Sequence, residues 1–80
     1  MDEGIITGYD GRFCMCCGGL MISFNGSLWP YSGDFKLIEN SYETGISPNE
    51  TFPIHVTVNW EPVTDKCSGN YIKVLKLVRK

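Results

Sequence analysis

The stretch from Phe52 to Glu61, FPIHVTVNWE, carries the clearest structural signal in the chain. Apolar and polar residues alternate along it, which is the period of a β-strand with one buried and one exposed face. Pro53 and Pro62 lie near the two ends, where proline removes no hydrogen bond from the middle of a sheet. The pattern predicts a strand over residues 52–61 whose inner face carries Phe52, Ile54, Val56, Val58 and Trp60.

Upstream, residues 20–31, LMISFNGSLWPY, predict a β-hairpin. Asn25-Gly26 is the pair that most readily takes the positive φ angles of a two-residue type I′ turn. Such a turn would place five apolar residues on one face as cross-strand partners. The expected pairs are Phe24 with Ser27, Ile22 with Trp29, and Leu20 with Tyr31.

The remaining segments suggest three more strands. Residues 5–9 form a short β-pattern before the Asp10-Gly11 turn, and GDFKLIENS reads as a strand or one helical turn. Residues 39–51 read as a loop with room for a turn of helix. The C-terminal NYIKVLKLVRK reads as a strand whose alternation predicts a bulge near Val74.

These elements predict one all-β domain over residues 1–80, a small five-stranded, partly open antiparallel β-barrel of OB or SH3 type. A chain of 80 residues has a thin core. Disulfides, a structural metal or homo-oligomerisation commonly stabilise domains of this size. The cysteines therefore need a structural interpretation first.

The formal charge of −2 gives no general attraction to nucleic acid or to an anionic membrane. All nine acidic residues lie within residues 1–65, whereas residues 66–80 carry five of the seven basic ones. We expect two oppositely charged surfaces that attract each other within the fold, with a basic partner-binding edge as the alternative. No apolar run approaches the roughly 18 residues of a membrane span.

Three of the four cysteines, Cys14, Cys16 and Cys17, fall within CMCCGG, and Cys67 lies far downstream. Cys14-x-x-Cys17 followed by glycine is the spacing of a zinc knuckle. Such a site would need Cys67 and either Cys16 or His55 as further ligands. The sequence thus predicts no cofactor, with zinc as the alternative.

A disulfide needs only that Cys67 approach the cluster, which is possible at one end of a small barrel. A bridge within the cluster would join Cys14 to Cys17, because a bond between adjacent Cys16 and Cys17 strains the peptide between them. A thiol redox enzyme would need a helix after the cluster, where the sequence predicts a strand. Copper on Met15 and Met21 competes with a simple core role for methionine.

The remaining polar and aromatic residues suggest no catalytic site. His55 is the only histidine, and a surface position on a polar strand face explains it best. Trp29, Tyr31, Phe35 and Trp60 could form a stacking patch of the kind with which OB barrels bind nucleic acid. The predicted strands instead place Trp29 and Trp60 in the core, and the acidic character argues against nucleic acid.

The segments GYDGRFCMCCGGLMISFNG, FPIHVTVNW and a final C...NYIKVLKL resemble a group of small bacterial proteins with a C-x-C-C-G-G signature. Many of that group look like exported lipoproteins, and the group has no established function. The resemblance implies that a leader was removed and that Cys67 packs against the cluster. A periplasmic location would follow, whereas a native Met1 would place the protein in the cytoplasm.

The sequence thus predicts a non-enzymatic β-barrel binding or interaction module, held together by disulfides at its cysteine cluster. A structural zinc protein is the first alternative and an OB-like nucleic-acid-binding module the second. The expected partner is a protein or a small ligand.

Overall fold

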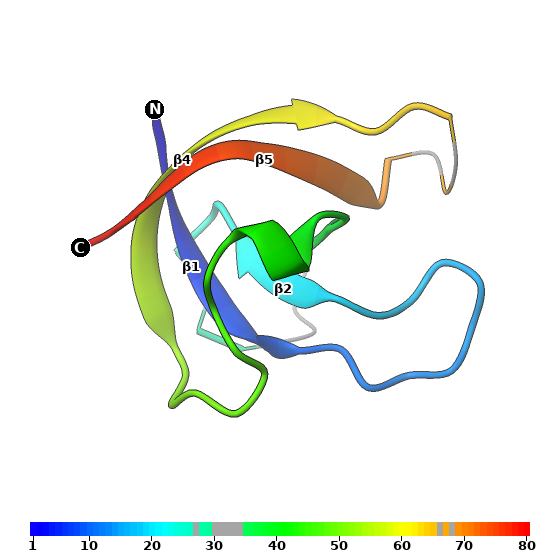
Figure 1. Cartoon of the computed structure of the whole chain (residues 1–80), viewed down its shortest axis with the longest axis horizontal. Coiled ribbons are helices and arrows are strands. Elements are labelled where there is room, and N and C mark those ends of the chain that lie inside the picture. The colour runs from blue at the N-terminus through cyan, green and yellow to red at the C-terminus, as the bar shows by residue number, and fades with distance from the viewer. Residues whose placement is uncertain (27, 30–34, 66, 68) are drawn as a thin grey trace.

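The computed structural model describes residues 1–26, 28–29, 35–65, 67 and 69–80. These ranges contain five strands and one short 3-10 turn. They are β1 (Asp2–Tyr9), β2 (Leu20–Ser23), β3 (Lys36–Ile38), η1 (Ser41–Glu43), β4 (Ile54–Pro62) and β5 (Tyr71–Arg79). The strands close into a barrel in the order β1-β2-β3-β5-β4 (Figure 1). The predicted small five-stranded β-barrel is confirmed, and η1 is the turn of helix expected within residues 39–51.

The barrel is closed, where the sequence suggested a partly open one. β1 completes the circle because it pairs antiparallel with both β2 and β4. A bulge between Ile6 and Gly8 interrupts the ladder with β2, and such a bulge bends a strand and increases its twist. One pair is parallel: β3 runs alongside β5, with Leu37 opposite Tyr71.

The pairing of β4 with β5 confirms the strand and bulge predicted from the two alternation patterns. Val56 and Val58 of β4 are fully buried. Along β5 the register shifts between Asn59 opposite Lys76 and Trp60 opposite Val74, so that Leu75 is the extra residue and is 58% exposed. The bulge returns the next leucine, Leu77, to the core side, where it packs against the buried cluster.

The predicted tight hairpin over residues 20–31 is wrong in its register. β2 ends at Ser23 and pairs with β3, with Ile22 opposite Lys36 and Leu20 opposite Ile38. Gly26 does adopt a positive φ of 81°, but Ser23 Oγ donates to Asn25 Oδ1 at 2.6 Å and the chain leaves the sheet there. Trp29, expected inside, is 70% exposed. The expected partners Ser27 and Tyr31, together with Pro30, lie outside the described residues.

Two apolar clusters cover the two faces of the sheet around β2 and β3. The inner cluster fills the barrel and comprises Ile6, Leu20, Ile22, Ile38, Ile46, Val56, Val58, Ile72 and Val74. The outer cluster comprises Met21, Leu37, Val63 and Tyr71. Residues 21 and 37 alternate with the inner residues along their strands, so the outer cluster lies on the face that would otherwise meet solvent. Loops must therefore cover it.

The expected attraction between oppositely charged surfaces is present in the fold. Arg79 Nη1 of β5 lies 2.7 Å from Glu50 Oε1, and Lys80 pairs with Glu3 of β1. Both bonds join the basic C-terminus to the acidic part of the chain. They are exposed pairs, which typically stabilise a fold only slightly.

A buried amide continues the pairing of β3 with β5 beyond the end of the shorter strand. Asn40 is almost fully buried; its Nδ2 donates to the carbonyl of Val74 at 2.8 Å, and its Oδ1 accepts from Val74 N at 2.9 Å. The side chain thus satisfies both backbone groups of one β5 residue next to the bulge. An apolar residue at position 40 would leave both groups buried without these bonds.

We expect Asn40→Leu to lower the free energy of unfolding by about 2–4 kcal/mol, because each buried group that loses its partner costs about 1–3 kcal/mol. Urea unfolding measures the change. The matched control is Asn49→Leu in an exposed loop, for which we expect a change within about 0.5 kcal/mol. Equal effects of the two substitutions would contradict the role assigned to Asn40.

Candidate functional site

The cysteine loop, residues 10–19 between β1 and β2, brings the chain's four cysteines to one end of the barrel. Cys14 pairs with Cys17 within the loop, with 5.1 Å between their Cα atoms. Cys16 pairs with Cys67, which lies between β4 and β5, with 5.5 Å between the Cα atoms. Both pairs lie at disulfide distance. The sequence suggested Cys14 with Cys17 and a bond from Cys67 to the cluster, and the structure shows that Cys16 is the cysteine beside Cys67.

The Cys16–Cys67 pair lies over the outer apolar cluster. Both cysteines are half-buried and pack against this cluster together with Phe35. Met21 and Leu37 beneath them are each only 2% exposed. The pair therefore joins the two loops that cover this face of the sheet.

Asp10 organises the inside of the cysteine loop. Its carboxylate accepts from Arg12 Nε at 2.9 Å, from Arg12 Nη2 at 2.9 Å, and from the backbone N–H groups of Arg12 and Gly18 at 3.1 and 3.3 Å. The side chain of Asp10 has no exposed surface. The hydrogen bonds from the Arg12 side chain lower the pKa of Asp10 to about 2, against the opposing effect of burial.

The two glycines after Cys17 serve the loop differently from a zinc knuckle. The N–H of Gly18 points at the Asp10 carboxylate, whereas a knuckle would point backbone amides at the sulfur ligands. Gly19 has a positive φ of 94°, and a Cβ at this position would lie 2.8 Å from the carbonyl oxygen of Ile38. The backbone therefore approaches β3 as closely as only glycine permits.

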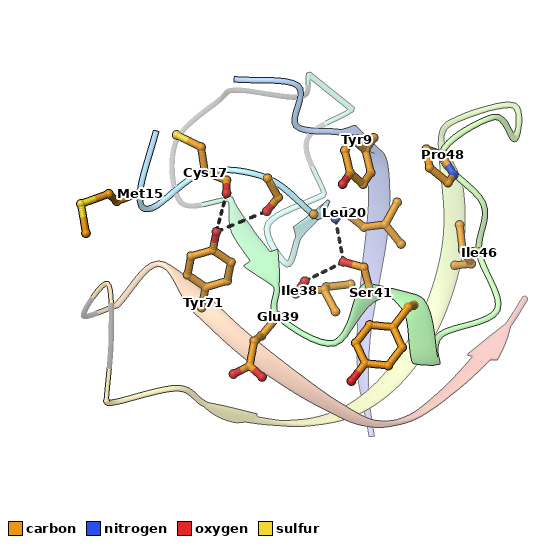
Figure 2. A pocket seen from close by; sticks show the side chains of 13 residues that line it. Tyr9, Met15, Cys17, Leu20, Ile38, Glu39, Ser41, Ile46, Pro48 and Tyr71 are labelled. Atoms are coloured by element: carbon orange, nitrogen blue, oxygen red, sulfur yellow. Dashed lines mark hydrogen bonds between the residues drawn. The ribbon is translucent and has the colours of Figure 1, made fainter. Parts of the chain in front are cut away.

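Two side-chain hydroxyl groups tie the end of the loop to the barrel (Figure 2). Tyr71 Oη of β5 donates to the carbonyl of Cys17 at 2.8 Å. Ser41 Oγ of η1 accepts from the N–H of Leu20 at 2.9 Å and donates to the carbonyl of Ile38 at 2.6 Å. The start of β2 is thus fixed from both sides. Burial, followed by the negative charge of Asp10, raises the pKa of Tyr71.

A cavity of about 520 Å³ lies between the cysteine loop and η1. Its size is within the range typical of small-molecule sites. Its described lining residues come from β1, the cysteine loop, β2, the segment from β3 to residue 48, and β5 (Figure 2). They are Tyr9, Met15, Cys17, Gly18, Gly19, Leu20, Ile38, Glu39, Ser41, Tyr42, Ile46, Pro48 and Tyr71.

The rim of this cavity is apolar, aromatic and negatively charged. Met15 and Tyr42 of the lining are 98% and 85% exposed. Phe13, two residues before Met15 in the sequence, is fully exposed. Glu39 is the one charged side chain among the described lining residues. The negative charge of Glu43, with a smaller contribution from Glu39, raises the pKa of Tyr42. Both carboxylates thus act on this side of the rim.

The structure keeps His55 away from the four cysteines. It lies on β4 opposite Ile5 and lines a separate hollow with Glu3, Phe24 and Lys80. Within the described ranges, no three His, Cys, Asp or Glu side chains are arranged to hold a metal ion. The cysteines stand in pairs, and zinc stays a prediction.

Two of the aromatic residues expected to form a stacking patch, Trp60 and Phe35, have different neighbours. Trp60 stacks on Phe24 with 5.2 Å between ring centroids and donates through Nε1 to Asp2 Oδ2 at 2.8 Å. Phe35 lies instead beside Arg12, whose Cζ is 5.7 Å from its ring centroid. Tyr31 lies outside the described residues.

Sequence reasoning missed Asp10, Tyr9, Tyr42 and Tyr71 as site residues. Asp10-Gly11 carried only a turn signal, although the arginine two positions later was a possible sign of a charged pair within the loop. The tyrosines had no signal, because β1, η1 and β5 bring them together only in the folded barrel.

Comparison with protein-family models, with curated proteins and with solved structures found no match to this chain. Over the parts that the structure describes, no helix has the length and apolar character needed to cross a membrane. The fold and the geometry of the cavity are therefore the basis for a functional proposal.

We expect Asp10→Asn to lower stability by about 1–2 kcal/mol at neutral pH, because the substitution removes the charged partner of Arg12. The pKa of Asp10 in the folded state, about 2, lies below its ordinary value of 3.8. The ionised carboxylate therefore stabilises the fold above about pH 4, and this contribution is lost as the pH falls towards 2.

Urea unfolding of the wild type and Asp10→Asn between pH 7 and pH 2 tests this prediction. The difference between the two proteins should shrink below about pH 4. Asp65→Asn, at an exposed position, is the matched control and should cost little at any pH. A difference that stays constant with pH would contradict the role of the ionised carboxylate.

The two cysteine pairs should contribute unequally to stability if both form disulfides. Cys16 and Cys67 are 51 residues apart, whereas Cys14 and Cys17 are three apart. In the chain-entropy model, removal of the long-range bond costs about 4 kcal/mol and removal of the short one about 2 kcal/mol. We therefore expect the double variant Cys16→Ser/Cys67→Ser to unfold at lower urea than Cys14→Ser/Cys17→Ser.

The melting temperature of the wild type, measured with a reducing phosphine and separately with EDTA, distinguishes disulfides from a bound metal. The reductant should lower the melting temperature, and the chelator should leave it unchanged. Destabilisation by the chelator, with no effect of the reductant, would show that the cysteines hold a metal.

Proposed function

We propose that this protein is a non-enzymatic binding module whose cavity beside the cysteine loop takes a small ligand or a single side chain of a partner. The observation that carries the proposal is the cavity of about 520 Å³ with an exposed apolar and aromatic rim. Met15 and Tyr42, which both line the cavity, are largely exposed, and apolar surface exposed together in this way marks interaction sites.

The way the cavity is built supports a preformed site. Its loop wall is held by Asp10 from inside, by the Cys16–Cys67 pair from the side, and by Tyr71 from the barrel. A wall fixed in this way loses little conformational freedom when a ligand binds, which favours affinity.

The strand order, with a parallel pair between β3 and β5, supports an OB-like interpretation of the barrel. OB barrels bind oligomers on the face of strands 2 and 3 and with the loops between strands 1 and 2 and strands 4 and 5. Here the corresponding loops carry Cys16 and Cys67, and they cover Met21 and Leu37 on that face. We propose that binding occurs instead in the neighbouring cavity.

A nucleic-acid ligand is the less favoured alternative. Contacts of Lys and Arg with phosphate supply most of the affinity for nucleic acid. The described lining of the cavity contains no Lys or Arg, and Glu39 would repel a phosphate.

Two features support the non-enzymatic part of the proposal, and a third supports an exported location. The hydroxyl groups of Ser41 and Tyr71 are engaged with backbone carbonyls, so they serve the structure of the wall. Asp10, whose pKa is shifted most clearly, is held by Arg12 inside the loop and does not line the cavity. Four cysteines in pairs at disulfide distance favour an oxidising compartment such as the periplasm.

A fragment screen by ¹H–¹⁵N NMR tests the proposed site. We expect shifts to concentrate on the backbone amides of Gly18, Gly19, Leu20, Glu39 and Tyr42. Fragments that shift these amides should bind more weakly to Met15→Ala than to Met1→Ala, because both methionines are exposed and only Met15 lines the cavity. Shifts centred on the separate hollow of His55 and Lys80, or none at all, would refute the proposal.

A further inference from the structure

The lining of the cavity combines aromatic rings with a single type of charge. Three tyrosines, from β1, η1 and β5, surround it: Tyr9, Tyr42 and Tyr71. Their hydroxyl groups are not all available, since Tyr71 Oη donates to the carbonyl of Cys17. The faces of aromatic rings carry partial negative charge and attract a cation. The rings therefore favour a positively charged ligand over an anionic one.

The carboxylates around the cavity act in the same direction as the rings. Glu39 lines it, and Glu43 neighbours Tyr42 on η1. Two cations, from the loop and from β3, have partners outside the cavity lining. Arg12, whose charge also acts on Tyr71, is bound to Asp10, and Lys36 Nζ donates to the carbonyl of Gly69 at 2.6 Å. A cation that enters the cavity would meet carboxylate charge on one side and no Lys or Arg among the described lining residues.

Most of the remaining described lining is apolar, so the ligand should carry apolar groups next to its charge. Leu20, Ile38, Ile46, Pro48 and Met15 offer hydrocarbon or thioether surface, and the hydroxyl of Ser41 already bonds to Leu20 and Ile38. A primary ammonium keeps a strong hydration shell and needs several hydrogen-bond acceptors. An alkylated ammonium needs few acceptors and gains from contact with rings and methyl groups.

From these observations we propose that the cavity binds an organic cation with an alkylated ammonium head, such as a trimethylammonium group. The inference rests on the proposed binding function and deepens it by naming the ligand class. Tyr42 and Glu39 supply the discrimination, through the ring face and the carboxylate charge. The same head group occurs in free solutes and in lipid headgroups, and the two sources need separate measurements.

Choline and 3,3-dimethyl-1-butanol are the matched probes, because they have nearly the same shape and only choline is charged. NMR titration of each into the oxidised protein gives the two dissociation constants. We expect choline to shift the amides of Gly18, Gly19, Glu39 and Tyr42 and to bind roughly three- to tenfold more tightly than the alcohol. Equal binding at these amides would overturn the charge inference and leave the binding site standing. If neither probe shifts them, the inference fails, while the proposed binding function fails only if the fragment screen also leaves these amides unshifted.

Variants at the rim separate the ring from the carboxylate. Tyr42 is exposed, so its substitution should leave the fold intact. Tyr42→Phe keeps the ring and should keep choline affinity within about twofold, while Tyr42→Leu should weaken it about threefold. Glu39→Gln should weaken choline roughly two- to fivefold and leave the alcohol unchanged. Equal affinity in Tyr42→Phe and Tyr42→Leu would overturn the role of the ring.

Co-sedimentation with phosphatidylcholine vesicles, against phosphatidylglycerol vesicles, separates the two sources of the head group. Sedimentation with phosphatidylcholine alone, abolished by free choline, would assign the site to a lipid headgroup. Choline binding without sedimentation would assign it to a free solute. Preference for phosphatidylglycerol would overturn the inference, because that lipid carries no ammonium group.

Discussion

The contact between the cysteine loop and the segment around Cys67 is the constraint on which the site depends. These segments lie far apart in the sequence, and Cys16 meets Cys67 over an outer cluster that contains Met21 and Leu37. Without this cover, the outer face of β2 and β3 would present apolar side chains to solvent. The contact between Cys16 and Cys67 therefore shields one face of a very small barrel from solvent. The same contact holds one wall of the cavity in place.

Much of the fold was predictable because it follows from local periodicity. The alternation around Val56 and Val58 identified β4, and the phase change between Val74 and Leu77 located a bulge that the structure places at Leu75. A side-chain period of two is a property of the strand itself, and for this reason it is visible in sequence. The closed barrel followed less directly, since closure depends on β1 reaching both β2 and β4.

The hairpin and the site depend on partners distant in sequence, so local pattern could not reveal them. Gly26 does adopt a positive φ, but β2 pairs with Leu37 and Ile38 of β3, which in turn pairs with β5. The spacing of the four cysteines was enough to identify them as candidate disulfide or metal residues. The tyrosines of the cavity could not be identified in this way, because three separate elements bring them together.

The cysteines hold the loop, and the cavity beside the loop is the proposed binding site. A chain with such a distinctive cysteine cluster therefore need not use thiol chemistry. A domain of 80 residues has little apolar surface to spare, and an open cavity removes packing from one end of its core. The paired cysteines and the bond between Arg12 and the buried Asp10 carboxylate hold the loop without filling the space beside it. The cysteines would then make an open cavity compatible with a stable fold, and the ligand would be recognised by the rings and the carboxylate at its rim.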